Sequence, residues 1–326
     1  GWVEVGRTTL GSALDDITVS SLADKRYYMI LRSALNSGDI SSFLQMGSGS
    51  VDTGSNYAQR FSSDGAADGS SVNQTKIFCG DNNTSPKFNV GYIANLSAKE
   101  KLYQGWEIMQ NTAGAGTAPR RMESTGKWAN TANPLDTINF YNSMGGSYDT
   151  GSEMVVLGWD PTDTHTTNFW EELASVDLSG GAATNIDSGT ITAKKYLWCQ
   201  LYTEQSIDSD YLLTFNADSG SNYCRRYSND GGGDGLNTSR AYFDITSYPA
   251  NLPMFMNFFI INNSANEKLI IAHHAYQNTA GAGTAPHRSE TVGKWINTSA
   301  QITAMNIKSG SGNLASKTVL KIWGSD

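Results

Sequence analysis

The sequence predicts an all-β protein made of two tandem homologous domains, each an antiparallel β-sandwich of jelly-roll type. Two observations predict this fold class. An internal duplication covers nearly the whole chain, and the apolar segments are short and separated by glycine-rich turns. Long segments with helical periodicity are missing, so we expect helix to be scarce.

The duplication is clearest in the segment QNTAGAGTAP, which occurs at residues 110–119 and again, letter for letter, at 277–286. The offset, 277 − 110 = 167 residues, also relates residues 100–102 (EKL) to 267–269. Further upstream the offset is 166, where residues 54–57 (GSNY) match 220–223. The repeat also pairs three tryptophans with three others: Trp2 with Trp170, Trp128 with Trp295, and Trp159 with Trp323.

This period is too long for a solenoid, whose repeats run about 20 to 50 residues, so each copy is interpreted as a complete domain. We place the domains at residues 1–161 and 167–326, with a polar linker at 162–166. Each copy is long enough to bury its own core. A sheet needs a second layer over its apolar face, so two sheets per domain are expected.

The expected strands are runs of about five to eight residues rich in β-branched and aromatic side chains. Residues 27–31 (YYMIL) and 154–159 (MVVLGW) are examples from the first copy, and 196–202 and 319–323 from the second. Turn vocabulary such as SSDGAADGSS and NDGGGDG separates them.

Charge and hydropathy exclude some classes of protein. With 23 basic and 31 acidic residues, the formal charge is −8, which argues against a surface that binds nucleic acid or anionic lipid. The most apolar run, residues 254–261, is too short to span a bilayer, so no membrane insertion is expected. The N-terminal residues show no secretory signal pattern.

Cysteine usage indicates a reducing compartment. Cys79, Cys199 and Cys224 are odd in number and have no CxxC spacing. None of them is a cysteine in the other copy, whereas a disulfide essential to the fold would recur there. We therefore expect buried free thiols.

Catalytic patterns are weak. A β-sandwich glycosidase needs two carboxylates facing each other across a cleft, and the adjacent acidic residues Glu171 and Glu172 are the candidate pair. Neighbouring residues of a strand point to opposite faces, so His273 and His274 are unsuited to chelating one metal. We expect no enzymatic activity, no catalytic residues and no cofactor. The other histidines are His165 and His287.

Paired aspartates leave a metal alternative open. The turns that contain Asp64 with Asp68, and Asp230 with Asp234, place two carboxylates close together in both copies, as calcium sites do. Asp-Gly is also common turn vocabulary, and the alternation of ligands seen in EF-hands is missing, so ordinary turns are the preferred interpretation.

The duplicated segment has two interpretations, an ordered hairpin loop or a contact loop that docks on a neighbouring subunit. Near it, two pairs of residues lie two apart on one strand face and are expected to form structural ion pairs: Arg121 with Glu123, and Arg288 with Glu290. Tryptophans repeated in both copies are expected in the core, which leaves Trp106 and Trp198 as candidates for a surface role.

Several phrases carry a resemblance. The opening GWVEVGRTTLGSALDDITVSSLADKRYYMIL, together with DTGSNYAQR, QNTAGAGTAPRRMESTGKW and SEMVVLGWDP, resembles uncharacterised virion proteins of marine viruses of the tailed-phage class. The resemblance covers both halves but includes no site motif. It implies a β-rich, oligomeric component of a particle surface, such as a capsid decoration protein, spike or fibre module.

We therefore expect a non-enzymatic structural protein of a virion, assembled in the host cytoplasm, whose partners are capsid or tail proteins and other copies of itself. A carbohydrate-binding adhesin, using its loops or Trp106 against a glycan on a host surface, is the competing class. A β-sandwich glycoside hydrolase using Glu171 and Glu172 is a third.

Overall fold

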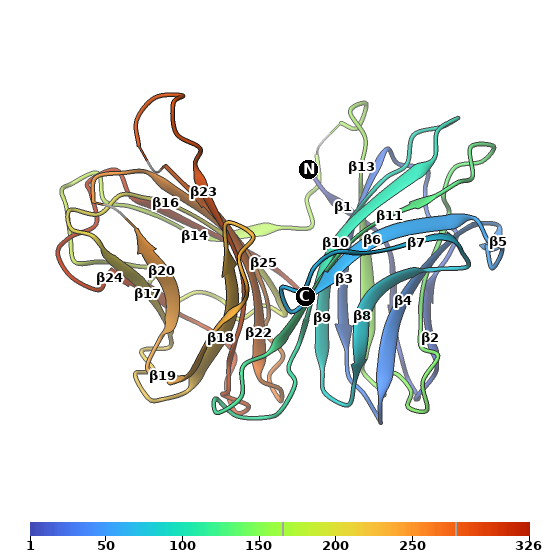
Figure 1. Cartoon of the computed structure of the whole chain (residues 1–326), viewed down its shortest axis with the longest axis horizontal. Coiled ribbons are helices and arrows are strands. Elements are labelled where there is room, and N and C mark those ends of the chain that lie inside the picture. Colours follow the sequence, from blue (N-terminus) through green and yellow to red (C-terminus); the bar gives the residue numbers. More distant parts are fainter. Residues whose placement is uncertain (165, 249, 278) are drawn as a thin grey trace. The chain divides into compact units, whose positions relative to one another are not determined.

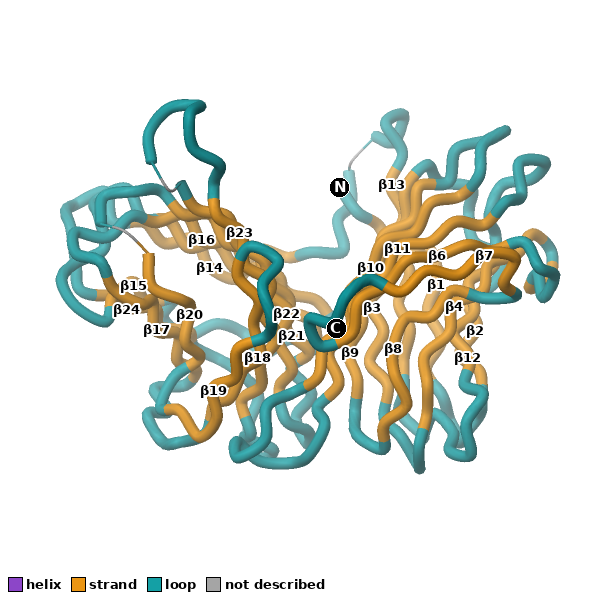
Figure 2. The backbone as a smooth tube through the Cα atoms, in the orientation of Figure 1, coloured by secondary structure: helices purple, strands orange, loops and turns teal. Residues whose placement is uncertain are grey.

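The structure, a computed structural model, describes residues 1–164, 166–248, 250–277 and 279–326, with only the backbone described at 246–248. Strands and loops make up all of these residues, and Figure 2 shows no helix among them. All strand pairs are antiparallel. The predicted fold class, two antiparallel β-sandwiches, is confirmed, and helix is as scarce as expected.

The chain forms two compact units. Unit 1 comprises residues 1–111 and 120–169, and unit 2 comprises residues 112–119 and 170–326. The change of unit at Phe169–Trp170 lies just after the predicted linker. The predicted boundaries did not anticipate that residues 112–119 belong to unit 2.

Unit 1 has a larger and a smaller sheet (Figure 1). The larger sheet has eight strands in the order β1 (Val3–Thr9), β13 (Glu153–Trp159), β3 (Tyr27–Ala34), β9 (Lys87–Ala94), β10 (Lys101–Met109), β11 (Arg120–Trp128), β6 (Tyr57–Ser63) and β7 (Gly69–Gln74). In the smaller sheet β2 (Asp16–Val19) pairs with β12 (Thr137–Tyr141) and β12 with β4 (Ile40–Ser48), while β5 (Ser50–Val51) and β8 (Ile77–Asn83) also pair with β4.

Unit 2 repeats this arrangement. Its larger sheet has the order β14 (Glu171–Asp177), β25 (Val319–Ser325), β16 (Tyr196–Thr203), β21 (Met254–Ile261), β22 (Lys268–Tyr276), β23 (His287–Trp295), β18 (Tyr223–Asn229) and β19 (Gly235–Arg240). Its smaller sheet has the order β15 (Asn185–Asp187), β24 (Met305–Ser309), β17 (Ser209–Phe215) and β20 (Phe243–Tyr248).

Strand register gives the exact equivalence of the two units and corrects one predicted pair. Gly158 lies opposite Tyr28 in unit 1, and Gly324 lies opposite Leu197 in unit 2. The strands β13 and β25 therefore align glycine to glycine, so Trp159 corresponds to Ser325 and Trp323 to Leu157. The predicted pairing of Trp159 with Trp323 is therefore wrong. It matched two residues of the same type, whereas strand register determines which positions of the two units are equivalent.

Each unit buries its own core between its two sheets. The core of unit 1 includes Ile30, Leu44 and Phe140, and that of unit 2 includes Leu201, Leu213 and Ile307. These residues alternate along their strands with residues that point to the opposite sheet face. Alternation thus leaves each larger sheet with an outer face, away from the core, that is available for other contacts.

The same hydrogen bond forms in both sandwiches, between a buried tryptophan and an aspartate. The indole Nε1 of Trp128 donates to Asp52 Oδ2 at 2.7 Å, and that of Trp295 donates to Asp218 Oδ2 at 2.6 Å. Burial would raise the pKa of Asp52, but its hydrogen bonds with Trp128, Asn56 and the Gly54 N–H hold that pKa below its ordinary value. The predicted core position of Trp128 and Trp295 is confirmed, since each is at most 1% exposed.

Candidate docking site

The outer face of the larger sheet of unit 1 carries an open groove of about 820 Å³. Tyr28 and Tyr103 point into the core, so alternation along β3 and β10 sends Tyr27 and Leu102 to this outer face. The groove is lined mainly by apolar groups. The members used below are Trp2, Tyr27, Ala58, Gln59, Arg60, Tyr92, Leu102, Gln104, Lys127 and Trp159, and the set is called the unit 1 groove.

The apolar part of the groove is exposed. Leu102 is 56% exposed and Tyr27 37% exposed, although both sit on central strands of the sheet. Tyr27 stacks on Trp159 with ring centroids 5.4 Å apart, and Trp2 lies 6.4 Å from Tyr92. An exposed apolar patch of this kind is a candidate binding surface.

Two exposed ion pairs border the groove. Lys127 Nζ lies 2.8 Å from Glu100 Oε2, with side chains 45% and 38% exposed. Arg60 lies 3.6 Å from Asp68, with side chains 61% and 54% exposed. Exposed pairs of this kind contribute little to stability, so they remain available to bind another group.

Unit 2 shows what the equivalent face can bind, because it holds the first copy of the duplicated segment, residues 112–119. The Arg226 Nε–H donates to the Pro119 carbonyl at 2.8 Å, and the Ser239 N–H donates to the Ala115 carbonyl at 2.7 Å. Lys294 donates to the Thr112 carbonyl, and the Gly114 N–H donates to Glu267. The Cys224 thiol lies 3.4 Å from the Thr117 carbonyl. The face therefore binds the backbone of the segment.

The first of these ion pairs is buried in unit 2. Glu267 and Lys294, equivalent to Glu100 and Lys127, are 3.2 Å apart with side chains 4% and 0% exposed. Leu269 lies opposite Lys294 on the neighbouring strand and is 1% exposed, against 56% for the equivalent Leu102. One sheet face thus exists in two states, covered in unit 2 and open in unit 1.

The paired aspartates of both turns are bound by arginine or histidine side chains. Asp64 and Asp81 both contact Arg120, and Asp68 pairs with Arg60. In unit 2, His287 pairs with Asp230 and Arg226 with Asp234. Within the described residues, no group of three or more His, Cys, Asp or Glu is placed to hold a metal ion. The geometry favours ordinary turns over the calcium alternative.

The acidic pair considered for hydrolysis does not form a facing pair. Glu171 and Glu172 are adjacent on edge strand β14 and contact different lysines, Lys194 at 3.5 Å and Lys321 at 3.2 Å. On β22, His274 is buried and His273 half-buried, as expected for neighbouring residues that point to opposite faces. His165 lies outside the described residues.

The predicted ion pairs form in both copies, between Arg121 and Glu123 and between Arg288 and Glu290. The three cysteines are free and buried, as predicted. Burial raises the pKa of the Cys79 and Cys224 thiols to about 12, so both stay protonated and unreactive.

The tryptophans follow the prediction only in part. Trp2 and Trp159 are half-buried in the unit 1 groove, so the prediction that repeated tryptophans are core is wrong for both. Trp198 stacks on Trp323 with ring centroids 4.8 Å apart and donates to Asn257, so it has a structural role. Trp106 is half-buried and contacts Tyr92 edge-on.

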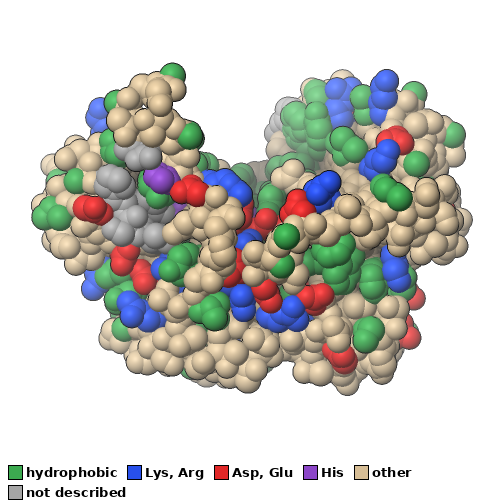
Figure 3. All heavy atoms as spheres, in the orientation of Figure 1, with side chains coloured by type: hydrophobic (Ala, Val, Ile, Leu, Met, Phe, Trp, Pro, Cys, Tyr) green, Lys and Arg blue, Asp and Glu red, His purple; other side chains and the backbone are tan. Residues whose placement is uncertain are grey.

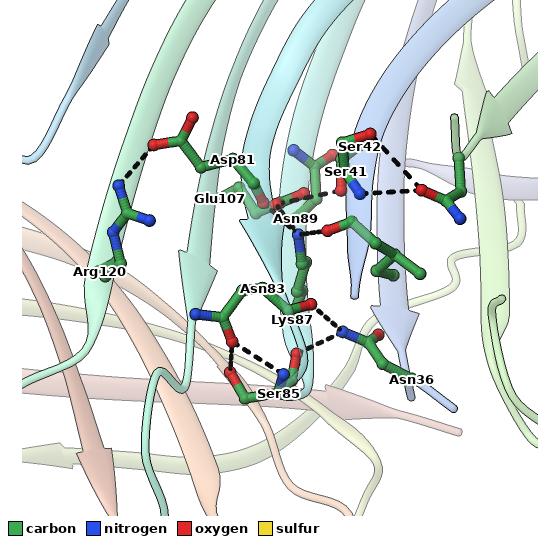
Figure 4. Close-up of polar contacts among 12 residues, drawn as sticks. Asn36, Ser41, Ser42, Asp81, Asn83, Ser85, Lys87, Asn89, Glu107 and Arg120 are labelled. Atoms are coloured by element: carbon green, nitrogen blue, oxygen red, sulfur yellow. Dashed lines mark hydrogen bonds and ion pairs between the residues drawn. The ribbon is translucent and has the colours of Figure 1, made fainter. Parts of the chain in front are cut away.

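A buried ionic cluster inside unit 1 was not predicted (Figure 4). Glu107 accepts hydrogen bonds from Arg32 and from Ser42, and it lies 3.9 Å from Lys87 Nζ. All three charged side chains are fully buried. Lys87 also donates to the Ile40 carbonyl at 2.7 Å, and burial lowers its pKa to about 8. The charged residues are spread over three strands, so no local pattern could reveal the cluster.

Two further observations concern the surface charge and membrane-spanning helices. In the face shown in Figure 3, acidic and basic side chains are interspersed among uncharged ones, without a large area of one sign. Among the residues described, the structure contains no helix that is long and apolar enough to cross a membrane.

Comparisons with known proteins add little. No family model matches the chain, and no curated protein matches its sequence. Among solved structures, the chain is similar to domains LG4-5 of the mouse laminin alpha1 chain at 8% identity, covering 99% of this chain and 90% of that one, with a TM-score of 0.17. It is also similar, at 12% identity, to a chain from work on the in-meso crystallization of membrane proteins, covering 82% of each chain with a TM-score of 0.14. Scores this low carry no argument about function.

Proposed function

We propose that this chain is a non-enzymatic structural protein that assembles with other protein subunits through the outer faces of its larger sheets. The observation that carries the proposal is the state of that face in unit 2, where it binds the backbone of an eight-residue protein segment through Arg226, Lys294, Glu267 and the Ser239 N–H. The equivalent face of unit 1 is apolar, open and bordered by the same charges.

The resemblance of the sequence to virion surface proteins suggests which assembly this is. We propose a capsid decoration, spike or fibre component whose partners are capsid or tail proteins, located in the virion and assembled in the host cytoplasm. An uncharged, glycine-rich loop that offers its backbone for hydrogen bonding suits a permanent protein contact.

Fractionation of native lysate by size tests the proposal. The chain should elute in a large assembly together with other subunits, whereas a purely monomeric chain would contradict it. Leu102→Glu, which places a charge in the unit 1 groove, should shift the chain toward smaller species. Met144→Glu is the matched control, because Met144 is 42% exposed and lies outside the groove.

Carbohydrate binding is the second candidate, and one observation favours it. The unit 1 groove combines the exposed ring of Tyr27 and the half-buried ring of Trp159 with the amide side chains of Gln59 and Gln104. Rings beside hydrogen-bonding amides suit a sugar surface. Glycan-array binding that is lost on Trp159→Ala and kept on Trp106→Ala would place a glycan in this groove. Loss on Trp106→Ala alone would place it at the site expected from the sequence.

A further inference from the structure

The two copies of QNTAGAGTAP have the same conformation and different surroundings. Residues 112–119 and 279–286 show the same succession of bends and turn, and Gly114 and Gly281 share a left-handed backbone, with φ of +86° and +91°. In the first copy, Ala115 is 5% and Ala118 4% exposed. Every residue of 279–286 is exposed, and Figure 2 shows this loop projecting beyond β22 and β23.

The second copy is therefore preorganised for the contact that the first copy makes. Its backbone already has the bound shape, so little conformational entropy is lost when it docks. Its side chains are identical to those of the first copy, so any face that accepts residues 112–119 suits residues 279–286 equally well.

Unit 1 presents such a face. The positions of unit 2 whose contacts with residues 112–119 are described above have equivalents in unit 1, on the strand ladders or directly beside them. Ser239 and its equivalent Asn73 even share a left-handed backbone, with φ of +50° and +53°, which presents the N–H in the same way. The equivalent pairs are Glu267 and Glu100, Lys294 and Lys127, Arg226 and Arg60, Cys224 and Ala58, and Ser239 and Asn73.

Arg60, Lys127 and Ala58 line the unit 1 groove. The one chemical difference among these three positions, Cys224 against Ala58, removes a thiol and leaves more room. The charged pair that binds the segment in unit 2 is intact but exposed in unit 1. The unit 1 groove therefore has the residues that bind such a segment but holds no segment. Residues 279–286 of unit 2 have the sequence of the bound segment but are exposed.

We propose that residues 279–286 of one copy of this chain dock in the unit 1 groove of a second copy. In this contact Lys127 and Arg60 donate to the Thr279 and Pro286 carbonyls, and Glu100 accepts from the Gly281 N–H, as their equivalents do in unit 2. Each copy carries one segment and one groove, so the contact links copies head to tail or reciprocally. The inference rests on the proposed function, for which it supplies the partner.

A disulfide-trapping experiment tests the contact directly. The equivalence of Cys224 with Ala58 and of Thr117 with Thr284 predicts that residues 58 and 284 of two copies lie in contact. A mixture of the full-length variants Ala58→Cys and Thr284→Cys should form a covalent heterodimer on mild oxidation. The native cysteines are buried and should stay silent. Ala280→Cys in place of Thr284→Cys is the matched control, because its equivalent Ala113 remains exposed in the docked copy.

Self-association of the full chain gives an independent readout by analytical ultracentrifugation. Ala282→Glu puts a charge at the position equivalent to buried Ala115, and should weaken association at least about tenfold. Ala280→Glu adds the same charge at the position that stays exposed and should leave association unchanged. Lys127→Glu should weaken it from the groove side, and an equimolar mixture of Ala282→Glu with Lys127→Glu should recover one contact.

A wild-type chain that stays monomeric at all concentrations, or association that Ala280→Glu and Ala282→Glu weaken equally, would overturn the inference. If such a monomeric chain still joined a large assembly with different subunits, the proposed function would stand and only the identity of the partner would fall. If it joined no assembly, both would fall.

Discussion

The two units are the same sandwich filled in two different ways. Where unit 1 has Arg32, Lys87 and Glu107 in its interior, the equivalent positions of unit 2 hold Leu201, Met254 and His274. Both sets are buried, and both sheets keep the same strand order. The comparison teaches that strand register and turns specify this frame, whereas the interior can be filled by charged or by uncharged side chains. Replacement of buried ion pairs by apolar residues is often neutral or stabilising.

The outer faces of the two larger sheets differ in another way. Their charged residues are the same, and only the burial of these residues differs. Lys294 and Glu267 are covered in unit 2, and Lys127 and Glu100 are open in unit 1. A duplicated face that keeps its binding residues after the copies have diverged elsewhere is consistent with a binding role for both. The predictions below test these differences, from the largest expected effect to the smallest.

The largest effect is expected inside unit 1. Glu107→Gln removes the charge that compensates Arg32 and Lys87, and should destabilise unit 1 by about 3–5 kcal/mol. His274→Gln, the equivalent change in unit 2, replaces a buried side chain that is kept uncharged by the burial that lowers its pKa, and should cost far less. Hydrogen exchange of residues 27–34 and 196–203 in the full chain reports on the two units separately. Equal loss of protection in both units would show that the cluster does not stabilise unit 1 specifically.

Truncation of the equivalent leucines sharpens the comparison of the outer faces. Leu269→Ala should cost about 2–5 kcal/mol because Leu269 is buried, whereas Leu102→Ala should change stability by less than about 0.5 kcal/mol. Denaturant unfolding of the full chain measures both. A cost for Leu102→Ala in the isolated chain that matches that of Leu269→Ala would mean that the unit 1 groove is closed in solution.

Acid should weaken unit 2 through His274. Burial, with His273 and Arg225 nearby, lowers the pKa of His274 from 6.5 to about 3. The unfolded chain therefore binds more protons than the folded chain between these values, so stability falls as the pH drops below 6.5. Two pH units below that value the cost reaches about 2.7 kcal/mol.

His274→Met, which copies the apolar character of its neighbours in the core, should remove this part of the acid sensitivity. Stability curves of the wild type and the variant should diverge below pH 6.5 and run parallel above it. Curves that stay parallel down to about pH 4 would contradict a neutral, buried His274.

The smallest difference is expected between Trp128→Phe and Trp295→Phe. Each variant loses one indole N–H donor to an aspartate, worth about 1–3 kcal/mol, and the two losses should be nearly equal because the geometry is the same. Thermal unfolding of both variants checks this. A clearly larger loss in one unit would show that the two ends are not closed by equivalent interactions.

The sequence by itself determined the architecture. The repeat, the short apolar runs and the glycine-rich turns predict two β-sandwiches, because periodicity and turn chemistry are local properties of the chain. The same reasoning predicted the core positions of Trp128 and Trp295, since each tryptophan recurs at the equivalent point of the other copy. The burial of the cysteines as free thiols was predicted from the opposite observation, that none of them recurs as a cysteine in the other copy.

Only the tertiary structure decided which copy of each repeated segment is buried and which is exposed. The identical residues 112–119 and 279–286 cannot show that the first segment is covered and the second exposed, because burial depends on residues more than a hundred positions away. Trp159 was predicted to be a core residue and the repeat counterpart of Trp323, but the strand register makes it equivalent to Ser325, and it lines an open groove. Local pattern sets which strands form, whereas the ladder and the opposing face set which side chains meet.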